Sequence, residues 1–167
     1  RHFRQVADAS RIPILIYHMP VLTHITISIE AVKTLSEHPN IIGMKDSSGD
    51  LPRLSSLVNV VPKTFHCIVG TASAWYPALT LGVRAGILAL ANFAGSQCAG
   101  VQKHYESGEH ERARDIFARL VPVNLAVTAT YGIAGLKYAA TLLGYEGGSV
   151  RSPLIPLGDA AQQHIKR

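Results

Sequence analysis

Four short apolar runs, each followed by a helical segment, set the strongest constraint on how this chain can fold. The runs cover residues 13–17, 41–45, 65–69 and 85–90. Successive strand–helix units take about 20–28 residues, and each run is apolar throughout, which is typical of strands covered on both faces. The pattern therefore predicts an α/β fold with a parallel sheet covered by helices.

The helical segments support the same interpretation. We expect helices, from apolar spacing and from Gly, Pro and Asp stop and start signals, over 1–10, 28–38, 50–62, 71–81, 96–107, 109–120, 133–143 and 158–166. Residues 21–27 are expected to form a loop. Four units are half of an eight-stranded (β/α)8 barrel, which usually needs about 250 residues. A doubly wound open sheet is the rival fold, although no G-x-G-x-x-G motif follows any strand.

The charge pattern argues against a nucleic-acid partner. The 167 residues include 16 Lys and Arg and 11 Asp and Glu, for a net charge of +5. The densest basic group is Arg112, Arg114 and Arg119, which alternates with acidic residues on one predicted helix. A solvated, self-paired helix face explains this better than a binding stripe. The apolar runs are also shorter than a membrane span, so no membrane partner is expected.

Cysteine and histidine usage gives no metal or redox motif. Cys67 and Cys98 lie in apolar segments without C-x-x-C spacing, which is typical of free thiols in a reducing compartment. The eight histidines include no H-E-x-x-H motif. We therefore expect no metal site.

Lys45 is the strongest candidate for a chemical role. It ends the 41–45 strand and precedes the turn Asp46–Asp50, and α/β folds place their chemistry at the carboxyl ends of strands. Desolvation there would favour the neutral amine, which attacks carbonyl groups. The alternative is an ordinary solvated lysine at a strand end.

Strand alternation gives Lys45 a neighbour. Leu15 and Tyr17 share one face of their strand, and Gly43 and Lys45 share one face of theirs. If these faces point into a barrel, Tyr17 and Lys45 end at the same rim, and Gly43 leaves room beneath Lys45. The alternative for Tyr17 is a core tyrosine with a partnered hydroxyl.

Two further residues follow strands. Ser47 lies in the turn after Lys45 and is either a site residue or an ordinary turn serine. Gly70 ends the third strand and allows either a tight turn or close approach of the backbone to a ligand. Asn92 is expected to cap the following helix.

Several motifs together resemble the dihydrodipicolinate synthase/N-acetylneuraminate lyase superfamily, whose members are Schiff-base aldolases and lyases on a (β/α)8 barrel. The matching segments are ILIYHMP (14–20), HPNIIGMKDSSGD (38–50), VGT (69–71), ALAN (89–92) and GIAGLK (132–137). Residues 132–154 and the GMKDSSGD segment are most similar to 4-hydroxy-2-oxoglutarate aldolase, which releases pyruvate and glyoxylate. The resemblance covers the C-terminal half of the family's sequence.

The resemblance assigns roles residue by residue. Lys45 matches the Schiff-base lysine and Tyr17 the tyrosine that relays protons. Ser47 and Gly70 match positions that contact substrate, and Ile87 matches a pocket position near bound pyruvate. It implies no cofactor beyond the covalent imine on Lys45, a 2-oxo acid as the small-molecule partner, and a homotetramer for a full-length protein.

The same resemblance implies a fold of strands 5–8 of the barrel, over residues 1–107, with a C-terminal helical extension over 108–167. Two features depart from the family. His18 stands where Asn is usual, and VLTHI (21–25) does not follow the usual loop. The first four units, with their carboxylate-binding motif and a second relay tyrosine, have no counterpart here. A truncated, non-catalytic fragment or partner is therefore an alternative to an active lyase, and location in the cytoplasm or the mitochondrial matrix is left open.

Overall fold

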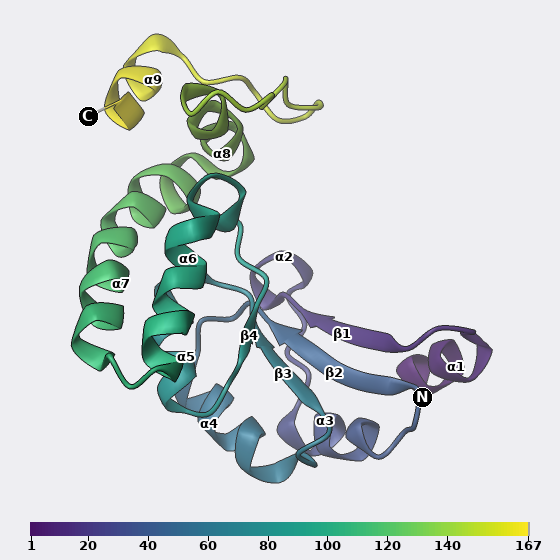
Figure 1. The fold of residues 1–167 in the computed structure, drawn as a ribbon. Helices are drawn as coiled ribbons and strands as arrows, with labels where there is room; N and C mark the ends of the chain where they lie inside the picture. Colours follow the sequence, from purple (N-terminus) through teal and green to yellow (C-terminus); the bar gives the residue numbers. More distant parts are fainter. Residues whose placement is uncertain (167) are drawn as a thin grey trace. The chain divides into compact units, whose positions relative to one another are not determined.

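The computed structural model describes residues 1–166 of the chain. Within this range a four-stranded parallel sheet is formed by β1 (Ile14–His18), β2 (Ile41–Asp46), β3 (His66–Val69) and β4 (Ala85–Gly86), which lie side by side in chain order (Figure 1). Each crossover between neighbouring strands carries helical segments. The α/β class and the parallel sheet predicted from the alternating pattern are thus confirmed.

Helices connect and follow the strands. They are α1 (His2–Ala9), α2 (Pro20–Thr23), α3 (Ile29–Ser36), α4 (Leu51–Val60), η1 (Ala72–Ala74), α5 (Trp75–Thr80), α6 (Ala91–Glu106), α7 (His110–Asn124), η2 (Leu125–Ala129), α8 (Thr130–Leu142) and α9 (Asp159–Lys166). Gly82, expected after the fourth of the predicted helices, has a positive φ of 92°, as a residue that ends a helix often does.

Three local predictions differ from the structure. The fourth strand is two residues long, and residues 88–90 turn into α6. Asn92 lies inside α6, where its side chain donates to Ala89 O instead of capping the helix. The segment after β1 contains the short helix α2, begun by Pro20, where a loop was expected. A short apolar run does not show where a strand ends, and a single polar residue does not show whether it caps a helix or lies inside one.

The two faces of the sheet are in different surroundings. Ile16 on β1 and Met44 on β2 are fully buried and pack with Val32 of α3 and Leu57 of α4. On the opposite face Leu15 and Tyr17 of β1 are 42% and 54% exposed. The core of this part of the chain therefore lies between the sheet and its helices, and the other face is open.

Helix α4 shows how the sequence positions the end of β2. Asp50 is its N-cap, and the Asp50 carboxylate accepts a hydrogen bond from Arg53 N at 2.9 Å. Leu54 and Leu57, three residues apart, form the buried side of the helix. The turn between Lys45 and α4 is consequently short and held at both ends.

The chain forms two compact units, one from Arg1 to Ile87 and one from Leu88 onward. In the second unit α6 and α7 pack on each other through the turn at Gly108, which has a φ of 79°. Tyr131 of α8 is bonded through its hydroxyl to His164 Nδ1 of α9 at 2.8 Å. The predicted division of the chain after residue 107 stays a prediction.

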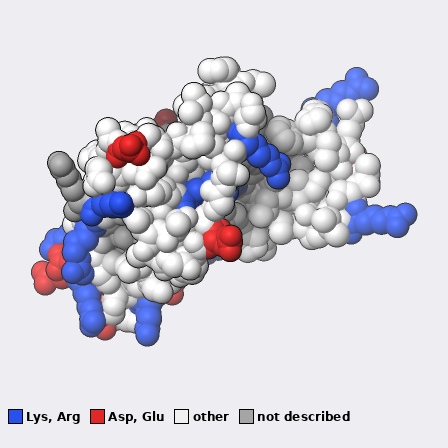
Figure 2. Space-filling model, turned by 90° about the horizontal axis from the view of Figure 1, so that it is seen from above, with Lys and Arg blue, Asp and Glu red and all other residues white. Residues whose placement is uncertain are grey.

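Charged side chains are dispersed or mixed in sign. On the face drawn in Figure 2, Lys and Arg side chains lie apart from one another or beside acidic ones. The Glu109 carboxylate lies 2.8 Å from His104 Nδ1 and 3.5 Å from Arg112 Nη1. The interpretation of α7 as a self-paired helix surface agrees with these contacts.

Helices α7, η2 and α8 follow one another without a loop, in contrast to the separate helices expected. This run, His110–Leu142, contains a window of mean hydropathy 1.4 and is long and apolar enough to cross a membrane by length and composition. One such helix is weak evidence for a span. Gly132, with φ 57° and ψ −138°, also interrupts its helical geometry.

The packing of α4 predicts a large difference between two positions on that helix. Leu57→Ala removes a side chain that is 0% exposed and should lower the free energy of unfolding by about 2–5 kcal/mol. Val60→Ala, on the same helix at a site 37% exposed, should cost much less. Urea denaturation of both variants measures the contrast, and equal losses would contradict this description of the core.

Candidate active site

Lys45 and Tyr17 lie side by side at the carboxyl ends of β2 and β1. They are register partners in the parallel pairing, and Lys45 Nζ lies 4.4 Å from the centre of the Tyr17 ring. A cation at this distance is attracted to the ring face. The neighbourhood predicted from strand alternation is therefore present, although Lys45 is only partly buried and its desolvation is incomplete.

Ser47 and Gly70 surround the stem of Lys45. A Cβ added at Gly70 would overlap Ser47 Oγ and would lie 2.9 Å from Lys45 Cε. Gly70 N donates to Asp46 O at 2.7 Å, and Ser47 N donates to His18 O at 2.9 Å. Ser47 Oγ is buried and has no hydrogen-bond partner among the described residues. A small residue at position 70 is thus required for Lys45 and Ser47 to occupy their places.

Gly43 differs from expectation, while the pocket role predicted for Ile87 stays a prediction. Ile87 follows β4, donates its N–H to Val69 O at 2.9 Å and is 50% exposed. It is two strands from Lys45, because β3 lies between. Gly43 leaves no open space beneath Lys45, since a Cβ there would lie 2.8 Å from Leu15 Cδ2 and 2.9 Å from His66 Cβ. The glycine permits close packing across the sheet.

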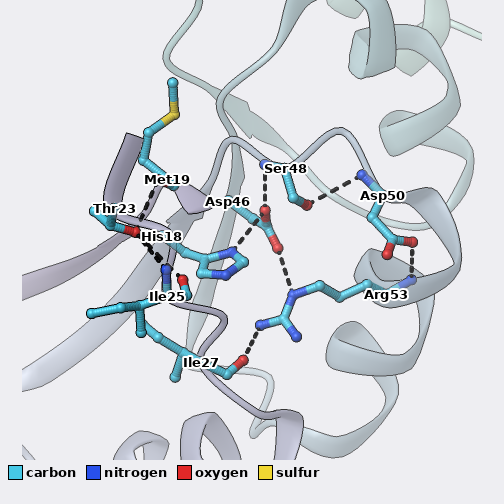
Figure 3. A network of polar contacts seen from close by, with 9 residues as sticks. All are labelled: His18, Met19, Thr23, Ile25, Ile27, Asp46, Ser48, Asp50 and Arg53. Carbon is cyan, nitrogen blue, oxygen red and sulfur yellow. Dashed lines mark hydrogen bonds and ion pairs between the residues drawn. The ribbon is translucent and has the colours of Figure 1, made fainter. Parts of the chain in front are cut away.

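Directly behind this pair lies a buried carboxylate, that of Asp46 (Figure 3). Its Oδ1 lies 3.2 Å from His18 Nδ1 and accepts from Ser48 N at 2.8 Å, and its Oδ2 accepts from Arg53 Nε at 3.2 Å. Burial opposes ionisation of Asp46, but the hydrogen bonds from Ser48 and His18 outweigh it and hold the pKa of Asp46 below its ordinary value. The group is therefore an anion at neutral pH.

Cys67, on β3, is not a competing nucleophile. Burial, together with the negative charge of Asp46, raises the pKa of its thiol to about 11. A thiol with this pKa is protonated at neutral pH and reacts slowly. Among residues 1–166 the structure shows no group of three His, Cys, Asp or Glu side chains placed to hold a metal ion.

Sequence reasoning missed the partnership of His18, Asp46 and Arg53. His18 and Asp46 each follow a predicted site residue, and alternation places them together on the other face of the sheet. That signal was available from the sequence. The contact of Arg53 with Asp46 could not be predicted from the sequence, since it depends on how α4 lies against the end of β2.

Comparison with known proteins agrees with this arrangement. All of residues 1–167 match the model of the dihydrodipicolinate synthetase family. The chain belongs to this family. A relative from Acidiphilium cryptum, named 4-hydroxy-tetrahydrodipicolinate synthase, is 34% identical over 99% of this chain and 57% of its own length.

Solved structures of the family match the fold closely. The dihydrodipicolinate synthase DapA-2 of Bacillus anthracis superposes with a TM-score of 0.95 at 25% identity, over 99% of this chain and 56% of that one. YagE of E. coli K12, a prophage protein of the same family solved in complex with pyruvate, gives 0.92 at 27% identity, over 99% and 58%. The chain thus spans somewhat more than half the length of these relatives.

The close contact at Gly70 predicts a cost for any side chain there. Gly70→Ala should displace Ser47 and Lys45 and lower the free energy of unfolding by about 1–3 kcal/mol. Gly95→Ala is the control, because within residues 1–166 nothing beyond the adjoining residues and helix backbone lies within 4 Å of a Cβ at that site, and alanine favours helix. Chemical denaturation of both variants tests this, and an unchanged Gly70→Ala protein would contradict the packing described.

The lowered pKa of Asp46 predicts how stability depends on pH. Its folded pKa is below the ordinary value of 3.8, so its contribution is complete above that value and is lost as pH falls through the folded pKa. The difference in unfolding free energy between the native protein and Asp46→Asn should therefore be large at pH 7 and shrink under strongly acidic conditions. A difference that is the same at both pH values would show that the charge of Asp46 contributes nothing.

Proposed function

We propose that this chain is the lysine-bearing part of a Schiff-base lyase that cleaves a 2-oxo acid. The observation that carries the proposal is the pairing of Lys45 and Tyr17, with Nζ 4.4 Å from the ring centre, at the strand ends of a chain from the dihydrodipicolinate synthetase family. The pyruvate complex of YagE supports a pyruvate-type ligand. In this proposal β1–β4 correspond to strands 5–8 of a (β/α)8 barrel.

The chemistry follows from the two side chains. The neutral amine of Lys45 attacks the C2 ketone, and loss of water gives a protonated imine. Tyr17 gives its phenolic proton to the departing hydroxyl when this imine forms, and the resulting phenolate accepts the proton of the C4 hydroxyl. The C3–C4 bond breaks, and its electron pair flows to the imine nitrogen to give an enamine. An aldehyde leaves, a proton is returned to C3, and water hydrolyses the imine to release pyruvate and Lys45. No cofactor takes part.

The preferred substrate is 4-hydroxy-2-oxoglutarate, which would give pyruvate and glyoxylate. The support is the similarity of segments 43–50 and 132–154 to that aldolase. Dihydrodipicolinate synthase activity and N-acetylneuraminate lyase activity are the runners-up, and the Acidiphilium relative carries the name 4-hydroxy-tetrahydrodipicolinate synthase. All three use the same pyruvate chemistry at Lys45.

In its functional form we place the protein in the cytoplasm, as a homotetramer acting on this soluble substrate. The relatives reported above are bacterial, and none of them supports a mitochondrial location.

A specific observation favours a second candidate, a non-catalytic partner or fragment. The chain covers 56% and 58% of the two solved relatives described above, and within residues 1–166 β1 pairs on one side only. Leu15, Tyr17 and Ile87 are between 42% and 54% exposed. An unpaired strand edge is a site of association. A cooperative monomeric melt together with turnover of the 2-oxo acid by residues 1–167 would reject this candidate.

The lyase proposal predicts covalent trapping of pyruvate. Treatment of the 167-residue chain with pyruvate and borohydride should attach one reduced pyruvate to Lys45, and peptide mass spectrometry locates it. Lys45→Arg should abolish the adduct, since a guanidinium stays protonated. Lys63→Arg, at an exposed lysine, should leave it unchanged. No adduct, or an adduct on another lysine, would falsify the mechanism.

A further inference from the structure

Asp46 occupies a special place relative to the proposed nucleophile. It is the next residue after Lys45 on β2, so its side chain projects from the opposite face of the sheet. It is 4% exposed, and its carboxylate accepts from donors on three segments: β1, the turn after β2, and α4. One peptide unit joins this anchored residue to Lys45.

His18 stands in the same relation to Tyr17. It follows Tyr17 on β1, pairs in register with Asp46 and is 1% exposed. An ionised carboxylate only accepts hydrogen bonds, so His18 Nδ1 carries a hydrogen and donates a hydrogen bond to Asp46 Oδ1. His18 Nε2 has no partner among the described residues. The bond to Asp46 is thus the one polar contact of the His18 ring in that part of the chain.

Arg53 supplies the charge that Asp46 requires. Its Nε donates to Asp46 Oδ2 at 3.2 Å, and its Nη2 donates to Ile27 O at 2.6 Å. Figure 3 shows the guanidinium between the carboxylate and the backbone that leads into α3. Arg53 therefore holds one oxygen of the Asp46 carboxylate, and His18 holds the other.

We propose that His18 is a positioning residue: its hydrogen bond to Asp46, completed by Arg53, locks the ends of β1 and β2 so that Tyr17 and Lys45 face each other. The proposal rests on the lyase function proposed above. Tyr17 and Lys45 are held on the open face by a bond made on the covered face. Displacements of about 1 Å between reacting groups are enough to lower rates strongly.

The experiment compares donors at position 18 in the 167-residue chain. His18→Asn keeps a neutral N–H donor, and His18→Leu keeps the volume without one. The rate of borohydride trapping with pyruvate should fall about 10-fold or more in His18→Leu, and His18→Asn should keep most of it. His38→Leu is the matched control, because His38 also bonds a carboxylate, that of Asp8 at 3.0 Å, but it precedes the start of β2, at the opposite end of that strand from Lys45, and its partner is exposed.

Two results would overturn the proposal. One is an unchanged trapping rate in His18→Leu, and the other is a His18→Asn rate as low as that of His18→Leu. If His18→Leu does not fold, Asp46→Asn takes its place, since it keeps the shape of the acceptor without its charge. It is expected to trap pyruvate equally slowly, and a native rate in Asp46→Asn would likewise reject the lock.

A second readout separates this proposal from the lyase function. Ser48 N donates to Asp46 Oδ1 at 2.8 Å, so loosening of Asp46 should accelerate hydrogen exchange at the Ser48 amide in His18→Leu but not in His18→Asn or His38→Leu. This holds even if the native chain traps no pyruvate, in which case the lyase proposal alone fails. An equal rate of hydrogen exchange at the Ser48 amide in all variants would by itself reject the positioning role of His18.

Discussion

The alternation of side chains along two paired strands is the constraint on which the site depends. β1 and β2 end in register, so their last two residue pairs project from opposite faces of the sheet. Tyr17 and Lys45 form one pair, on the open face, and His18 and Asp46 form the other, on the covered face. A slip of one residue in β2 would turn Lys45 onto the covered face, and the same slip in β1 would turn Tyr17 there, so either slip would break both pairs.

The surroundings of the two pairs differ in a way that suits their roles. The covered pair is anchored by a buried ion pair between Asp46 and Arg53, which is costly to separate because each charge would be left unpartnered in a dry environment. The open pair is held by the contact of Lys45 with the Tyr17 ring and by the close packing of Gly70 against the stem of Lys45. On each strand, one residue is fixed on the covered face, and the residue before it is accessible on the open face.

Sequence patterns predicted those parts of the structure that follow from strand parity and helix signals. Tyr17 beside Lys45, the cap at Asp50 and the parallel order of the strands all follow from spacing. The length of the fourth strand does not follow from spacing. Leu88 and Leu90 are buried, as the apolar run indicated, but through the turn into α6, since burial alone does not specify a strand. The crowding around Gly43 and the contact of Arg53 depend on packing between elements, which periodicity does not encode.

The bond from Arg53 to Ile27 has a consequence for how such proteins diversify. Arg53 holds the segment before α3 through a carbonyl oxygen, which every amino acid provides. The side chains of residues 21–27 can therefore change in the course of evolution while this anchor, and with it the placement of Asp46 and Lys45, is inherited intact. Variation in that segment and the placement of Lys45 are thereby separable, open to selection one at a time.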